Sequence, residues 1–316
     1  MSIKAEDRER LFQLIDQHQE AIVSYIQDLV RLPSETHPPG GDEYAAQMRV
    51  AESFRAMGLD KVDVFEPTEV PGIEQDPGWW PGLDYRDRPN VVGVWKGAGG
   101  GRSLLLNGHI DVVPAGPREL WDYDPYGGTV ADGKIFGRGA VDMKGPLGAA
   151  IMVARILKEN GFRLKGDLIL ASTVNEELGG YNGSLACIRR GYVADAGIVV
   201  EPTSLKIEPG TKGSVAYRIT VKGVGAHSHL WWMGTNALDK LLYLRDAMKR
   251  WEGERTQELR GHPLYGDPEI FPTPAIVEGM YHLSAGHPHL MSVPQEAVAD
   301  FHIDMVPGED TEEVAA

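Results

Sequence analysis

His109 and Asp111 close a short apolar run that spans residues 104–113. The run is rich in leucine and bounded by glycines, which predicts a buried strand. Residues two apart in an extended segment point to the same side, so Asp111 could accept a hydrogen bond from one ring nitrogen of His109 and leave the other for a metal ion. A loop histidine with an ordinary salt partner is the competing interpretation, and this spacing alone does not separate the two.

Further acidic residues stand at comparable positions. Asp142 lies in a glycine-rich loop, where it could instead be a helix N-cap. Glu176 and Glu177 follow a second buried run, residues 167–174, and adjacent carboxylates repel each other unless a cation lies beside them. A solvated loop pair is the alternative there, and Glu201 follows a third apolar run. Ligands bind at the carboxyl ends of strands in open α/β sheets, and imidazole with carboxylates suits zinc or another first-row divalent ion.

The elements that must position these residues change character near residue 210. Strand and helix patterns alternate before it, which predicts an α/β domain over residues 1–210 with a mostly parallel sheet. After it, half-exposed strand patterns and one helix predict a smaller α+β domain over residues 211–316. Its exposed strand and helix are candidates for a subunit interface.

Composition limits the kind of partner. The 316 residues hold 46 Asp and Glu against 31 Lys and Arg, a net charge of −15, which disfavours nucleic acid and anionic membranes. The single cysteine, Cys187, excludes an intrachain disulfide and fits a reducing compartment. No apolar run reaches transmembrane length and the first ten residues are polar, so we expect a cytoplasmic protein.

Six segments of the chain form a series of motifs: 107–113, 121–126, 137–145, 173–180, 201–203 and 225–229. The series resembles the dinuclear zinc deacylase and peptidase family that includes acetylornithine deacetylase, succinyl-diaminopimelate desuccinylase, carboxypeptidase G and aminoacylase. The resemblance covers nearly the whole chain, with the motifs in the family order. It implies a zinc-exopeptidase-like, three-layer catalytic domain and a smaller lid and dimerisation domain.

The resemblance also implies a set of metal ligands. His109 and Glu201 would hold one zinc ion and Glu177 a second, with Asp142 bridging both. Two zinc ions per subunit are expected, with Co²⁺ or Mn²⁺ as alternatives. The peptide bond between Asp142 and Met143 is commonly cis in the family.

Three catalytic roles follow from the same resemblance. Asp111 would orient His109, and Glu176 would act as general base on the attacking water. His227, in the smaller domain, would reach the active site of a partner subunit and stabilise the oxyanion. We therefore expect a homodimer.

The chain departs from the family pattern at its end. Family members continue into a closing piece of the catalytic domain that supplies the last histidine ligand of the second zinc, and this chain stops at Ala316. We expect it to be a fragment of a longer product, with a single-metal or degenerate relative as the alternative. Four histidines near the end of the chain lack the expected context, although one of them could substitute: His282, His287, His289 and His302.

A second departure concerns substrate recognition. Ser292 and Asp304 occupy the places of an asparagine and an arginine that often bind the substrate carboxylate, and an aspartate would repel such a group. A neutral or cationic substrate group is the expectation at that end. Trp231 and Trp232 could shape such a pocket or could pack as a loop under the helix.

The leading hypothesis is a metal-dependent hydrolase that cleaves an amide bond of a small N-acylated amine or peptide, as a deacylase or exopeptidase. The alternative is a catalytically degenerate relative that acts as a small-molecule binding protein or dimeric scaffold. A scaffold would have no physical need to keep several carboxylates together.

Overall fold

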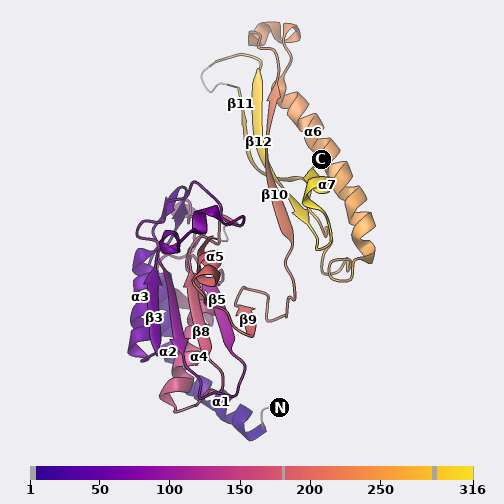
Figure 1. Ribbon diagram of the computed structural model, residues 1–316. Helices are drawn as coiled ribbons and strands as arrows, with labels where there is room; N and C mark the ends of the chain where they lie inside the picture. Colours follow the sequence, from indigo (N-terminus) through magenta and orange to yellow (C-terminus); the bar gives the residue numbers. More distant parts are fainter. Residues whose placement is uncertain (1–4, 180–181, 287–289, 316) are drawn as a thin grey trace. The chain divides into compact units, whose positions relative to one another are not determined.

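A computed structural model describes residues 5–179, 182–286 and 290–315 of the chain. Contacts within the chain divide it into two compact units, Met1–Leu205 and Lys206–Ala316 (Figure 1), called unit 1 and unit 2 below. Each unit is described by itself. The boundary predicted between residues 210 and 211, and the roles given to the two domains, stay predictions.

A five-stranded sheet forms the centre of unit 1, in the order β3-β4-β8-β5-β9 (Figure 1). Strand β4 runs antiparallel to β3 and to β8, while β8, β5 and β9 are parallel, so four of the five strands share one direction. The predicted α/β class with a mostly parallel sheet is therefore confirmed. The strands are β3 (Lys61–Phe65), β4 (Asn90–Trp95), β5 (Leu104–His109), β8 (Leu168–Thr173) and β9 (Ala196–Val199).

Helices cover both faces of this sheet, because its central strands are apolar on both sides. In β8, Leu168 and Leu170 face a core shared with α2, α3 and α4, whereas Ile169 and Ala171 face a core shared with α5. The result is three layers. The helices are α1 (Ala5–Gln17), α2 (Gln19–Val30), α3 (Tyr44–Ala56), α4 (Lys144–Glu159) and α5 (Asn182–Arg189).

Short elements fill the connections of unit 1. Strands β6 (Thr129–Ala131) and β7 (Lys134–Phe136) form a hairpin whose turn residues, Asp132 and Gly133, have positive φ of 49° and 70°. An Asp-Gly pair between two short strand-like runs predicts such a turn. The others are β1 (Thr36–His37), β2 (Gly40–Gly41), η1 (Pro67–Glu69), η2 (Ile73–Gln75) and η3 (Arg118–Leu120).

Unit 2 is an antiparallel sheet in the order β10-β12-β11 with a long helix, α6, on one face (Figure 1). Strand β10 alternates between half-buried and exposed residues, as predicted for a sheet with one covered face. Ala299 and Phe301 of β12 pack against Leu241 of the helix. The elements are β10 (Gly213–Lys222), η4 (Ser228–Met233), α6 (Ala237–Glu258), η5 (Leu259–Gly261), β11 (Gly279–Ala285), β12 (Glu296–Met305) and α7 (Thr311–Ala315).

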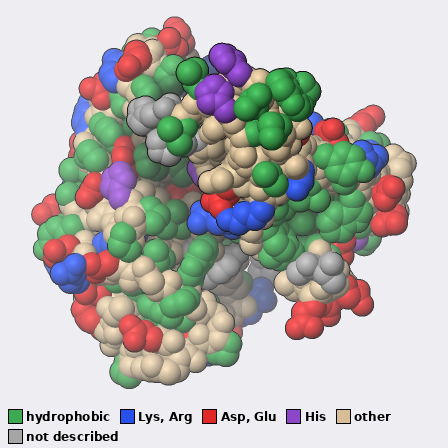
Figure 2. All heavy atoms as spheres, turned by 90° about the horizontal axis from the view of Figure 1, so that it is seen from above, with side chains coloured by type: hydrophobic (Ala, Val, Ile, Leu, Met, Phe, Trp, Pro, Cys, Tyr) green, Lys and Arg blue, Asp and Glu red, His purple; other side chains and the backbone are tan. Residues whose placement is uncertain are grey.

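The surface is charged with both signs. On the face seen in Figure 2, acidic and basic side chains are interspersed, and hydrophobic side chains reach the surface between them. Within the described residues, no helix is long and apolar enough to cross a membrane.

Candidate active site

Parallel pairing of β5 with β8 creates one polar edge in unit 1. The register places His109 beside Thr173, and the Ile110 N–H donates to the Thr173 carbonyl at 2.9 Å. The residues that follow the two strands therefore leave the sheet at the same edge. Strand β9 pairs with β5 in parallel and ends just before Glu201, while Asp142 lies just before α4.

His109 is the buried centre of this edge, with 1% of its surface exposed. Its Nδ1 lies 2.8 Å from the backbone carbonyl oxygen of Asp111, to which it can only donate, so Nε2 of the neutral ring is free to bind a cation. Nε2 faces three carboxylates, at 3.0 Å from Asp142, 3.6 Å from Glu176 and 3.7 Å from Glu201.

The Asp111 carboxylate has a different partner from the one expected. It lies 3.6 Å from Nδ1 of His109, and its two oxygens accept the backbone N–H groups of Glu176 and Glu177 at 3.2 and 3.1 Å. The backbone carbonyl of Asp111 thus holds the imidazole, while its carboxylate holds the loop of the two glutamates. This side chain is fully buried.

Three residues come close enough to share one ion. Among the described residues, His109, Asp142 and Glu201 each offer a ligand atom, and these atoms lie within 4.8 Å of one another. Ligands of a tetrahedral zinc lie about 2.0–2.2 Å from the metal and so roughly 3.5 Å apart. One imidazole with two carboxylates is a donor set that fits a first-row divalent cation, and small rotations of the half-exposed acids would close the group.

Electrostatics at this edge also favour a cation. Burial disfavours the charged imidazole, but the hydrogen bond to Asp142 and the nearby carboxylates outweigh it and raise the pKa of His109 to about 9. The hydrogen bond to His109 lowers the pKa of Asp142. Burial, with the charge of neighbouring acids, raises the pKa of Glu201 to about 7. The acids outnumber the positive charges that could neutralise them.

The two adjacent glutamates are placed differently. Glu176 is about half exposed, with an oxygen 3.6 Å from Nε2 of His109, and burial raises its pKa. Glu177 accepts the Val113 N–H at 3.3 Å and lies outside the three-residue group. Burial, reinforced by the charge of Asp142, raises the pKa of Glu177 to about 7.

The loop that carries Asp142 has the backbone implied by the family resemblance. The peptide bond between Asp142 and Met143 is cis. Sδ of Met143 accepts the backbone N–H of His109 at 3.1 Å, so this loop and the end of β5 touch directly.

His227 lies in unit 2, at the start of η4. Its Nδ1 accepts the His229 N–H at 3.2 Å, and it forms an isolated bridge with Ser292. Trp231 and Trp232 are 67% and 63% exposed, so they do not pack as a loop under the helix. The catalytic role of His227 stays a prediction.

Other residues of unit 2 have local partners. Asp304 is ion-paired with Lys212 at 3.1 Å, which offsets its charge. His282 lies 3.3 Å from Asp300, and His302 lies 3.9 Å from Asp304. His287 and His289, also considered for the last zinc ligand, lie outside the described residues.

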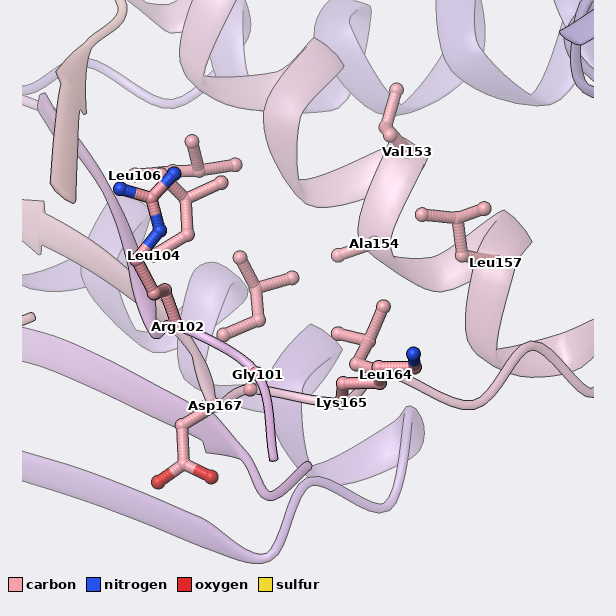
Figure 3. Close-up of a pocket in the computed structure, with 12 residues that line it drawn as sticks. Gly101, Arg102, Leu104, Leu106, Val153, Ala154, Leu157, Leu164, Lys165 and Asp167 are labelled. Atoms are coloured by element: carbon pink, nitrogen blue, oxygen red, sulfur yellow. The ribbon is translucent and has the colours of Figure 1, made fainter. Parts of the chain in front are cut away.

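A separate apolar cavity of about 430 Å³ lies at the opposite ends of the same strands (Figure 3). Leucines of β5 and β8 and residues of α4 line it, with Arg102, Lys165 and Asp167 at its polar positions. Binding sites are usually concave, but they also need polar groups that converge on the ligand. The chemistry-bearing residues lie instead at the polar edge.

Two buried features near the site were not assigned any role from the sequence. Arg88 and Glu43 form an ion pair through two hydrogen bonds of 2.8 and 2.5 Å, with both side chains essentially inaccessible. Lys144 is fully buried and donates to the Leu32 carbonyl at 2.6 Å. The place of Lys144 within the motif 137–145 could have drawn attention to it, but a single sequence position does not reveal whether a side chain is buried.

Comparisons with curated proteins give relatives of known type. The chain is 35% identical to N-formyl-4-amino-5-aminomethyl-2-methylpyrimidine deformylase of Halalkalibacterium halodurans over 216 residues, 68% of this chain and 46% of that protein. It is 34% identical to the probable succinyl-diaminopimelate desuccinylase of Staphylococcus epidermidis over 226 residues, 66% of this chain and 55% of that protein. The chain thus spans about half the length of the curated relatives it matches.

A solved structure shares the fold. An M20 family metallo-carboxypeptidase from Sulfolobus solfataricus matches with a TM-score of 0.64 at 18% identity, over 93% of this chain and 73% of that one. The model of peptidase family M20/M25/M40 matches residues 105–302, which include the polar edge of unit 1 and most of unit 2. The chain belongs to peptidase family M20/M25/M40.

Proposed function

We propose that this chain is part of a metal-dependent hydrolase that cleaves an amide bond of a small N-acylated amine or peptide. One observation carries the proposal. His109 ends β5 while Asp142 and Glu201 lie in two separate loops, and their ligand atoms lie within 4.8 Å of one another among the described residues. The deacylating enzymes among the relatives support the reaction class.

His109, Asp142 and Glu201 would hold one cation, and Glu177 with Asp142 would hold a second. Zinc is the proposed ion, two per complete site, since imidazole and carboxylate are its usual nitrogen and oxygen ligands. When bound, such ions polarise the amide carbonyl and lower the pKa of water.

Glu176 is the proposed general base. It would take the proton of the attacking water and return it to the leaving amine, so one carboxylate serves both halves of the reaction. Its oxygen lies 3.6 Å from the imidazole of His109, beside the ligand group, and its own side chain is half exposed and so accessible to a substrate. The Asp111 carboxylate would position it by accepting its backbone N–H.

The remaining parts of the proposal concern substrate and assembly. A neutral or cationic substrate group is proposed near Asp304, although Lys212 offsets part of that charge. His227 would stabilise the oxyanion in a partner subunit of a homodimer. The single, buried Cys187 supports a reducing compartment such as the cytoplasm.

The test is a hydrolysis screen of the zinc-loaded full-length gene product against N-acetyl, N-succinyl and N-formyl amines and dipeptides. The Glu176→Gln variant is the matched control, because it keeps the size of the side chain and removes its basicity. Release of amine by the parent chain and not by the variant supports the proposal. Zinc binding without any hydrolysis would favour the degenerate, ligand-binding relative instead.

A further inference from the structure

Lys144 stands out among the buried residues of unit 1. It is the first residue of α4 and has no exposed surface. Lysine is almost never fully buried without a partner, and a positive charge at a helix N-terminus opposes the helix dipole. Local helix chemistry therefore gives no reason for a lysine here, and its contacts outside the helix must supply one.

Those contacts join two segments of the candidate site. The ammonium group donates to the Leu32 carbonyl oxygen at 2.6 Å, and the backbone N–H donates to the Gly139 carbonyl at 2.8 Å. A side chain at Gly139 would meet the Lys144 stem at 3.1 Å and Val112 at 2.8 Å, so the stem crosses this glycine closely. Lys144 thus connects the loop that carries Asp142 with the segment that begins at Leu32.

The segment that begins at Leu32 supports the end of β5. The Ser34 hydroxyl donates to the Ile110 carbonyl at 2.6 Å, and the Ser34 carbonyl accepts the Val112 N–H at 3.0 Å. The Thr36 N–H donates back to the Val112 carbonyl at 2.9 Å. These bonds hold the backbone on both sides of Asp111, whose carbonyl in turn holds the imidazole of His109.

We propose that Lys144 is a positioning residue that sets the separation of His109 and Asp142 before a metal ion binds. It acts through the Leu32–Ser34 segment rather than by touching the ion or the substrate. The predicted effect on metal binding rests on the proposed function. The coupling between the two loops does not, because it exists in the metal-free chain.

Lys144→Met tests this with little change in side-chain shape. Methionine is unbranched like lysine, but it lacks the positive charge and the N–H groups that donate the hydrogen bond. The substitution removes a desolvated ammonium group but also leaves the Leu32 carbonyl without its donor, so the two effects oppose each other and we expect a melting temperature close to that of the parent. Zinc affinity, measured by chelator competition, should fall about 10- to 100-fold, as for other groups that orient metal ligands. The Co²⁺ absorption spectrum should change with it.

A second measurement does not depend on metal. In the metal-free chain, amide hydrogen exchange at Val112 and Thr36 should be faster in Lys144→Met than in the parent. Lys158→Met is the matched control, since it makes the same substitution in the last turn of the same helix. It should change neither exchange at these amides nor zinc affinity.

Should Lys144→Met fail to fold, Ser34→Ala decides instead. It keeps the lysine and removes only the bond to Ile110, so zinc affinity should fall about two- to tenfold. Parent-like exchange and parent-like affinity in a folded Lys144→Met or Ser34→Ala protein would overturn the inference. A parent chain that binds no zinc would refute the proposed function, and the exchange data would still decide whether Lys144 couples the loops.

Discussion

The two ends of the paired strands β5 and β8 differ sharply in character. At one end, Leu104 pairs with Leu168 and both line an apolar cavity of about 430 Å³. The other end is the polar edge of unit 1, called the charged end below. There His109 pairs with Thr173, and carboxylates from three loops surround the imidazole. The same two strands thus provide an apolar space and a charged cluster at opposite ends.

This difference shows that the end of the sheet with a cavity need not be the end that carries the groups for catalysis. The cavity end holds an apolar space of about 430 Å³, but its polar side chains have local roles. Asp167, for example, pairs with Lys96 and accepts the Gly97 N–H. The charged end has uncompensated acids that a cation would neutralise. We therefore expect substitutions at the charged end to change activity and those at the cavity end to change stability.

The largest effect is expected at the charged end, from Glu176→Gln. If Glu176 moves the proton, kcat should fall by a factor of about 10² to 10⁴ while zinc content stays at the parent value. Steady-state kinetics with metal analysis on the same sample measures both. An unchanged kcat would remove Glu176 from the role of general base.

Beneath the charged end, Arg88→Met should cause the largest loss of stability. The substitution leaves Glu43 buried without its partner, which typically costs about 3–5 kcal/mol in the free energy of unfolding. Denaturant unfolding measures the loss. Arg86→Met is the control, because Arg86 pairs with Asp84 in solvent, and it should unfold like the parent. Equal effects of the two substitutions would contradict the view that this end is rigidly supported.

At the cavity end, Leu168→Ala should reduce stability without reducing activity. Leu168 is 7% exposed and lines the cavity, so truncation removes buried contacts and enlarges the space, at a cost of about 2–4 kcal/mol. Zinc content and kcat/KM of the folded variant should match the parent. A folded variant that lost zinc would show that the two ends are coupled rather than separate.

The smallest effect is expected outside both ends, at Asp63 of β3. Hydrogen bonds from Arg190, together with one from Tyr192, lower the pKa of Asp63 to about 2 from its ordinary value of 3.8. Because the folded-state pKa is depressed, the stabilisation is complete above pH 3.8 and is lost as the pH falls toward 2. Asp63→Asn should therefore cost about 1–2 kcal/mol at neutral pH, after allowance for solvent screening, and much less at pH 2. A pH-independent cost, measured by unfolding at several pH values, would contradict this cause.

The sequence predicted the elements of the charged end because each is local. The β5 and β8 runs are apolar and short, and His109, Asp142, Glu176 and Glu201 each stand where such a run or a glycine-rich loop ends. Other features depend on contacts between distant segments and were not predicted. The Asp111 carboxylate binds backbone amides 65 and 66 residues away, and Lys144 reaches a carbonyl 112 residues away.

Some elements also differed from prediction for reasons of packing. The apolar periodicity of residues 8–32 predicts one helix, but the structure breaks it at His18, whose φ of −104° leaves the helical region and whose Nδ1 lies 2.7 Å from the Leu14 carbonyl oxygen. The pattern of residues 236–251 predicts a helix that ends at Trp251, but α6 continues to Glu258, and buried Arg255 in its last turn binds Glu309. Strand β11 was missed because its register with β12 shifts at a bulge, which interrupts the alternating pattern.

The central claim is that loops distant in sequence together bind a divalent cation at the charged end of β5. Zinc titration of chelator-stripped parent chain beside the Asp142→Asn variant tests it most directly, with circular dichroism to establish that both are folded. The account predicts saturable zinc uptake by the parent and an affinity at least about tenfold weaker in the variant. A folded parent chain that takes up no zinc, or a variant that binds it equally well, would contradict the account.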